Sequence, residues 1–109
     1  MPDLLQAGIF FFNDGRYFEA HEAWEDMWRV TQGPLRLFYQ GLVQAAVGLH
    51  HLSRGNLNGA RAQLQKALSK LEQYPSQFCN IDNGRLVEDL RKALDSLTSQ
   101  HIRIERISL

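Results

Sequence analysis

The residues of this chain best suited to chemistry lie in the segment His21-Glu22-Ala23-Trp24-Glu25. His21 and Glu25 are four positions apart, so on a helix they share one face and can form a hydrogen-bonded pair. A histidine that is oriented by a carboxylate can transfer protons near neutral pH, and the same two groups can also ligate a metal ion. The spacing therefore marks His21 and Glu25 as the first candidate site residues.

A second polar set follows on the next predicted helix, at a spacing of four and then seven positions: Gln40, Gln44 and His51. The link between the two helices is short, so we expect them to pack antiparallel. Glu25 then lies near Gln40, and His21 lies near Gln44. At the far end, His51 lies near Tyr17. These neighbours predict a polar seam that runs along an otherwise apolar interface between the two helices.

Three interpretations of this seam are open. A buried network of histidine, glutamate and glutamine could fix the register of the helices, because buried polar groups need hydrogen-bond partners. The seam could also bind a metal or small ligand through His21, Glu25 and His51, although the segment lacks the second histidine of the HExxH motif and glutamine is a poor ligand for transition metals. The third interpretation is acid–base catalysis by His21 and Glu25. No metal and no cofactor is predicted.

The elements that position these residues form a repeat with an offset of 40 positions, between residues 8–28 and 48–68. Small residues match small residues and large apolar residues match large apolar ones: Gly8 with Gly48, Phe12 with Leu52, Gly15 with Gly55, Ala20 with Ala60, Trp24 with Leu64 and Trp28 with Leu68. This pattern is typical of a repeated helix–turn–helix unit. The order of glycine, turn glycine and alanine resembles the tetratricopeptide consensus.

Apolar periodicity and turn residues predict an all-α fold with five helices in a single domain, residues 1–109. Two stacked αα-hairpins, in a right-handed tetratricopeptide-like arrangement, make up the units at about 3–31 and 34–74. A capping helix follows a connector at 75–83. We expect the helices at about 3–13, 16–31, 34–54, 57–73 and 84–100, with the third as the central, most buried element. The tail 101–109 could extend the last helix, fray or dock on a partner chain.

Composition excludes several classes of protein. The chain has 109 residues, with 12 basic and 12 acidic side chains, so no global field favours nucleic acid or an anionic membrane. The single cysteine, Cys79, suits a reducing compartment, and no targeting segment or membrane span is visible. We therefore expect a cytoplasmic protein. The first helix is apolar nearly all round, which suggests a homodimer or another protein partner.

Two long motifs resemble domain-of-unknown-function family 309. The first runs from Phe12 to Glu22, with Glu25 and Trp28 after it. The second is Gln40-Gly41-Leu42-Val43-Gln44-Ala45-Ala46, followed by His51, Gly55, Asn56, Gly59 and Ala60. The resemblance spans about residues 8–75 and implies a small all-helical domain without an established activity. It also implies that the shared polar positions are His21, Glu22, Glu25, Gln40 and Gln44.

These observations predict a protein-interaction or scaffold module. The alternative is a small enzyme or metal-binding protein that acts through His21 and Glu25, with Gln44 and His51 assisting. The sequence does not decide whether the chain is an enzyme.

Overall fold

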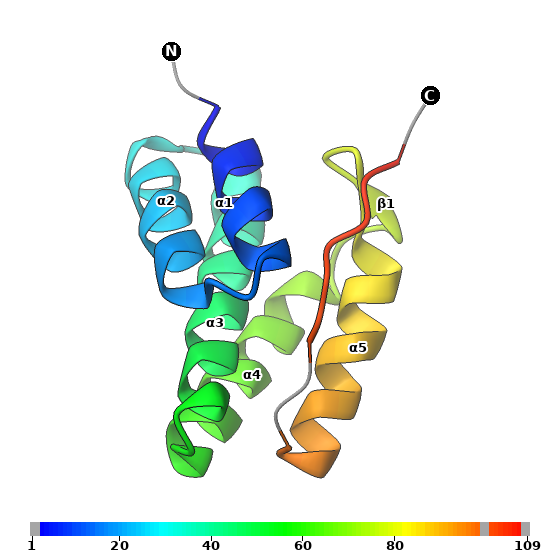
Figure 1. Cartoon of the computed structure of the whole chain (residues 1–109). Coiled ribbons are helices and arrows are strands. Elements are labelled where there is room, and N and C mark those ends of the chain that lie inside the picture. The colour runs from blue at the N-terminus through cyan, green and yellow to red at the C-terminus, as the bar shows by residue number, and fades with distance from the viewer. Residues whose placement is uncertain (1–2, 99–100, 108–109) are drawn as a thin grey trace.

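Five helices make up most of the computed structural model, which describes residues 3–98 and 101–107 (Figure 1). They are α1 (Leu4–Asn13), α2 (Tyr17–Val30), α3 (Leu35–Ser53), α4 (Leu57–Leu71) and α5 (Asn83–Ser96). Each helix packs on the next along the chain, so α3 lies between α2 and α4. The predicted all-α class is confirmed. Within the described residues, no helix is both long and apolar enough to cross a membrane.

The two hairpins, α1–α2 and α3–α4, turn in the same way. Gly15 and Gly55 both have a left-handed backbone, with φ of 78° and 76°, which is a conformation that glycine adopts without strain. In each turn the amide after the glycine donates to the carbonyl five residues before it, at 2.8 Å in the first hairpin and 2.9 Å in the second. The 40-residue offset predicted from the sequence is thus reproduced in the backbone.

The hairpins also close in the same way, through a glycine in the first helix and a large side chain in the second. A Cβ added at Gly8 would overlap the indole of Trp24, and one added at Gly48 would lie 2.8 Å from Leu64. Trp24 is fully buried and its indole N–H donates to the Leu5 carbonyl at 3.2 Å. The close helix approach inferred from the small residues is present in both units. The right-handed tetratricopeptide-like arrangement stays a prediction.

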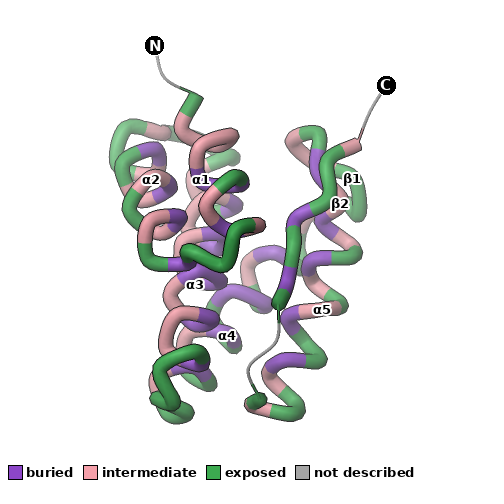
Figure 2. Tube along the Cα trace, in the orientation of Figure 1, coloured by how far each residue is buried: buried purple, intermediate pink, exposed green. Residues whose placement is uncertain are grey.

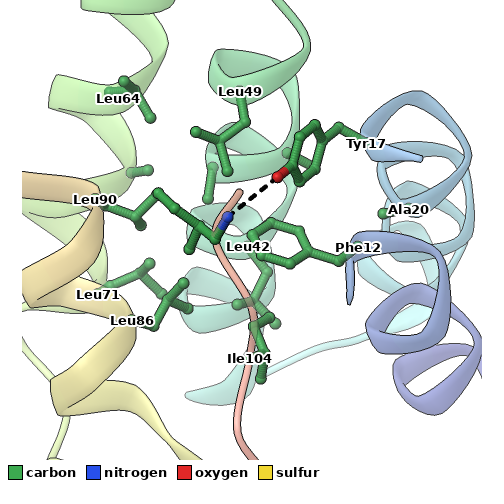
Figure 3. Packing of buried hydrophobic residues seen from close by; sticks show 14 of the residues in the cluster. Phe12, Tyr17, Ala20, Leu42, Leu49, Leu64, Leu71, Leu86, Leu90 and Ile104 are labelled. Carbon is green, nitrogen blue, oxygen red and sulfur yellow. Dashed lines mark hydrogen bonds between the residues drawn. The ribbon is translucent and has the colours of Figure 1, made fainter. Parts of the chain in front are cut away.

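Helix α3 is the central element of the core, as its small and apolar residues indicated. Eight of its residues are buried. Figure 2 shows the buried positions facing inward from all sides, and Figure 3 shows side chains from both hairpins meeting those of α5. The largest fully buried apolar side chains come from every helix, from the connector before α5 and from the tail: Trp24, Phe12, Phe38, Leu42, Leu49, Leu64, Leu71, Ile81, Leu86, Leu90 and Ile104.

The connector between α4 and α5 contains a small β-hairpin that the sequence did not predict. Strand β1 (Gln77–Phe78) pairs antiparallel with β2 (Ile81–Asp82), and both turn residues between them have positive φ. Asp82 caps α5 by accepting from the Arg85 amide at 2.9 Å. The prediction that α5 reaches residue 100 is wrong, because the helix ends at Ser96 and Leu97 adopts a left-handed backbone.

The tail packs on its own chain. It runs as an extended segment beside α5, drawn in orange-red in Figure 1, and buries Ile102 and Ile104 almost completely. The Asn13 side chain accepts from the Ile104 amide at 2.6 Å and donates to its carbonyl at 3.0 Å. The Tyr17 hydroxyl accepts from the Ile102 amide at 3.3 Å (Figure 3). The described part of the tail therefore neither extends α5 nor leaves its buried isoleucines for a partner chain. Residues 99–100 and 108–109 lie outside the described residues.

Candidate functional site

The predicted pair of His21 and Glu25 is formed on the outer side of α2. The Nε2 atom of His21 lies 2.6 Å from one carboxylate oxygen of Glu25, and the second oxygen of Glu25 accepts from Arg29 at 2.5 Å. Arg29 also donates to Asp26 at 3.0 Å. The side chains of His21 and Glu25 are 22% and 32% exposed, so the pair is half-buried. The imidazole is fixed in orientation by a carboxylate that is itself braced by a guanidinium.

The α3 residues of the predicted seam lie near this pair but do not bond to it. Glu25 shares an open pocket of about 280 Å³ with Gln40 and Gln44, which confirms that Glu25 and Gln40 are neighbours across the interface. Trp28 and Val43 complete the lining. No hydrogen bond joins the polar side chains of α2 and α3 among the described residues. The seam is thus a row of neighbouring polar groups rather than a closed network.

Tyr17 and His51 have different hydrogen-bond partners, and their predicted proximity stays a prediction. Tyr17 is buried under the tail, where its hydroxyl bonds to Ile102. His51 lines a pocket together with Phe18 and His21 of α2, and its Nδ1 lies 3.2 Å from the Asn56 side chain. The two residues differ because Tyr17 belongs to the core face of α2, whereas His51 lies at the edge of α3 that borders the groove.

An apolar pocket of about 320 Å³ lies between α2 and α3, lined by Phe18, His21, Val47, His50 and His51. The Phe18 ring lies 5.7 Å from the His21 ring and 5.5 Å from the His50 ring, measured between centroids. Phe18 is 48% exposed, so its ring leaves apolar surface open at the edge of this pocket. His50 and His51 are neighbours on α3, and both line this pocket.

A polar pocket adjoins the apolar one and shares Phe18 and His21 with it. All of its lining residues belong to α2, and the other four are Glu22, Glu25, Asp26 and Arg29. Glu22, which only the family resemblance placed among the site residues, is exposed here. Three carboxylates face a single guanidinium, so this end of the groove is acidic.

Several polar atoms that line or flank the groove are buried and have no hydrogen-bond partner among the described residues. They are Nδ1 of His21, Nε1 of Trp28, Nε of Arg36 and Oε1 of Gln44. The Arg36 guanidinium lies over the Trp28 ring, 4.1 Å from its centroid, which favours its charge through the aromatic face. Unpaired buried polar atoms lower the stability of the fold, and four of them lie beside this one groove.

Burial lowers the pKa of His50 below its ordinary value, and the nearby Arg54, His51 and His21 add to this effect. Glu19 acts in the opposite direction. The neutral imidazole is therefore favoured at neutral pH, which keeps this wall of the pocket uncharged.

The metal interpretation named His21, Glu25 and His51 as ligands. Among the described residues, no group of three histidine, cysteine, aspartate or glutamate side chains is placed to hold a metal ion. His21 and His51 line one pocket, while Glu25 faces the neighbouring ones.

Sequence reasoning missed the apolar residues of the groove, namely Phe18, Val43, Val47 and His50. A signal for them existed. On α2 the groove residues recur at positions 18, 21, 25 and 28, and on α3 at 40, 43, 44, 47, 50 and 51, which are single helical faces. These faces hold mixed polar and apolar residues, so a search for polar groups alone finds only half of each face.

The fold and site define a class of small helical domains in which two αα-hairpins present a groove along their junction. The family whose model matches residues 5–63 is the domain of unknown function DUF309, and the chain belongs to it. The match includes α1, α2 and α3 and hence every groove residue, whereas α5 and the tail lie beyond it.

Two relatives align over most of this chain. An uncharacterized protein of Aquifex aeolicus is 28% identical over 93 residues, which are 84% of this chain and 28% of that protein. The uncharacterized protein YpuF of Bacillus subtilis is 30% identical over 84 residues, which are 74% of this chain and 48% of its own length. The chain thus spans less than half of the length of either relative.

Proposed function

We propose that this chain is a polypeptide-binding domain whose α2–α3 groove holds a segment of a partner protein. The observation that carries the proposal is the open apolar pocket between α2 and α3, which is lined by Phe18 and Val47 together with three histidines. A bound segment would cover the Phe18 ring, which is 48% exposed in the free domain, and so would remove apolar surface from water.

The alignment with longer relatives supports a modular role. Sequence similar to this domain forms 28% of one protein and 48% of another, so the same helical unit occurs within chains of different length. A unit that recurs in this way behaves as a domain that can be joined to other segments.

The geometry favours binding over catalysis at His21. Its Nε2 is engaged by Glu25 and its Nδ1 is buried, so neither ring nitrogen is presented to a substrate. The enzyme alternative, with His21 and Glu25 as an acid–base pair, stays a prediction, as do the cytoplasmic location and the homodimer.

Selection from a phage-displayed library of random short peptides tests the proposal. We expect the wild-type domain to enrich peptides with a shared motif, and Phe18→Asp to abolish their binding. Phe10→Asp is the matched control, since Phe10 is 65% exposed on α1, outside the groove. Circular dichroism should show both variants folded. Failure to enrich any motif, or equal binding by Phe18→Asp, would overturn the proposal.

A further inference from the structure

The walls of the groove carry information about the chemistry of its occupant. The apolar pocket is bounded by the Phe18 ring on one side and by Val47 on the other, with imidazole rings between them. Its volume of about 320 Å³ is ample for one large side chain. Burial lowers the pKa of His50 and favours its neutral form near pH 7, so this side chain adds aromatic surface rather than charge to a mainly apolar pocket.

The adjoining acidic pocket differs in the charge that it leaves unbalanced. Arg29 contacts Glu25 and Asp26, and His21 also contacts Glu25. Glu22 is exposed and, among the residues that the structure describes, forms no ion pair. The pocket therefore keeps a negative potential toward solvent, which attracts a cationic group.

The two pockets are neighbours, since Phe18 and His21 belong to both. One ligand segment can therefore fill both when its apolar side chain and its charged side chain lie on one face. On a helical ligand these positions are three or four residues apart, and on an extended ligand two residues apart.

We propose that the occupant of the α2–α3 groove is a basic, amphipathic segment of a partner protein, with a large apolar side chain in the Phe18–Val47 pocket and a lysine or arginine against Glu22 and Asp26. This inference rests on the proposed function and adds the chemistry of the partner. Charge complementarity selects such a segment over an acidic one, because like charges at an interface are strongly disfavoured.

Charge reversal tests this inference. The double variant Glu22→Lys with Asp26→Lys should bind peptides selected on the wild-type domain at least roughly tenfold more weakly. In a fresh selection it should enrich the same apolar residue beside aspartate or glutamate. Glu88→Lys with Asp95→Lys is the control, since it reverses two exposed charges on α5 and should leave the motif unchanged. Fluorescence anisotropy at two salt concentrations should show weaker wild-type binding at high salt.

The outcomes separate the two proposals. A motif that depends on Phe18 but is acidic or uncharged would overturn this inference and leave the groove a polypeptide site. A motif that ignores the charge reversal would overturn it as well. Sedimentation analysis covers the remaining occupant: a homodimer that Phe18→Asp dissociates would identify a second copy of this chain and overturn the basic partner segment.

Discussion

The two hairpins have similar backbones but present different surfaces. Both turn at a left-handed glycine and both close where a glycine meets a large buried side chain. Their outer faces differ. In the first hairpin Phe18, His21 and Glu25 line a groove against α3, whereas the equivalent α4 residues are all exposed: Asn58, Arg61 and Gln65.

The comparison separates scaffold from site. Some positions that match between the units, such as Ala20 and Ala60, are fully buried. Three of the four α2 residues that line the groove lie at positions that do not match, whereas the fourth, Trp28, matches Leu68. Most of the α2 side of the groove is therefore found where one copy of the repeat departs from the other.

The largest effect is expected from alanine at the helix-crossing glycines. Gly8→Ala would push a methyl group into the Trp24 indole, and we expect a loss of about 3 kcal/mol in the free energy of unfolding, at the top of the usual range for overpacking. Gly48→Ala meets the more flexible Leu64 and gains helix propensity, so the net loss should be about 1 kcal/mol.

Urea denaturation of the two variants measures this difference. Trp24 fluorescence would report the displaced indole in Gly8→Ala alone. Equal losses in the free energy of unfolding for the two variants would contradict this prediction. They would show that the Trp24 indole adjusts to the added methyl group as readily as Leu64 does.

A smaller loss of stability is expected when hydrogen bonds between the first hairpin and the tail are removed, because the second hairpin has no such bonds within the described residues. Asn13 makes two hydrogen bonds to Ile104, while the equivalent Ser53 is exposed and bonds within its own helix. We expect Asn13→Ala to lower the free energy of unfolding by about 2 kcal/mol. Ser53→Ala should change it by less than about 0.5 kcal/mol.

Limited proteolysis of the same two variants would locate the effect. Faster cleavage within residues 101–107 is expected for Asn13→Ala only. If both variants resist cleavage equally, Asn13 does not secure the tail.

The helices and the repeat could be predicted because their signals are local. Periodicity and turn glycines fix the helix ranges within a few residues, and Gly8 with Trp24 shows the helix contact directly. The tail could not be predicted, since its partners Asn13 and Tyr17 are far away in sequence. The end of α5 at Ser96 could not be predicted either. The chain leaves the helix there, and Ile102 and Ile104 further along are buried in the core.

The candidate site was predicted in part for a similar reason. The pairing of His21 with Glu25 follows from a spacing of four residues within one helix. Its neighbours across the interface depend on how α2 rotates against α3, which a sequence does not specify. Hence Gln40 was placed near Glu25 correctly, whereas the pocket that His51 shares with Phe18 and His21 was not foreseen.

The smallest effect on stability is expected from the titration of His50. This residue lies where the two hairpins are in contact, whereas its equivalent in the first hairpin is open to solvent. Its equivalent in the first hairpin, Phe10, is 65% exposed, whereas His50 is partly covered by Phe18 from the neighbouring hairpin. Burial lowers the pKa of His50, so the unfolded chain binds this proton more tightly than the folded one. Its contribution to stability is therefore present above the ordinary histidine pKa and is lost as the pH falls through the lower, folded value.

Removing the cover should reverse this shift. We expect Phe18→Ala to raise the pKa of His50 toward its ordinary value, because desolvation is the largest cause, while Phe10→Ala should leave it unchanged. Imidazole NMR titration measures both. The remaining charged neighbours stay in place in these variants, so their influence cancels in the comparison: Arg54, His51, His21 and Glu19. A His50 pKa that did not respond to Phe18→Ala would mean that these charges, and not the stacking of one hairpin on the other, control the imidazole.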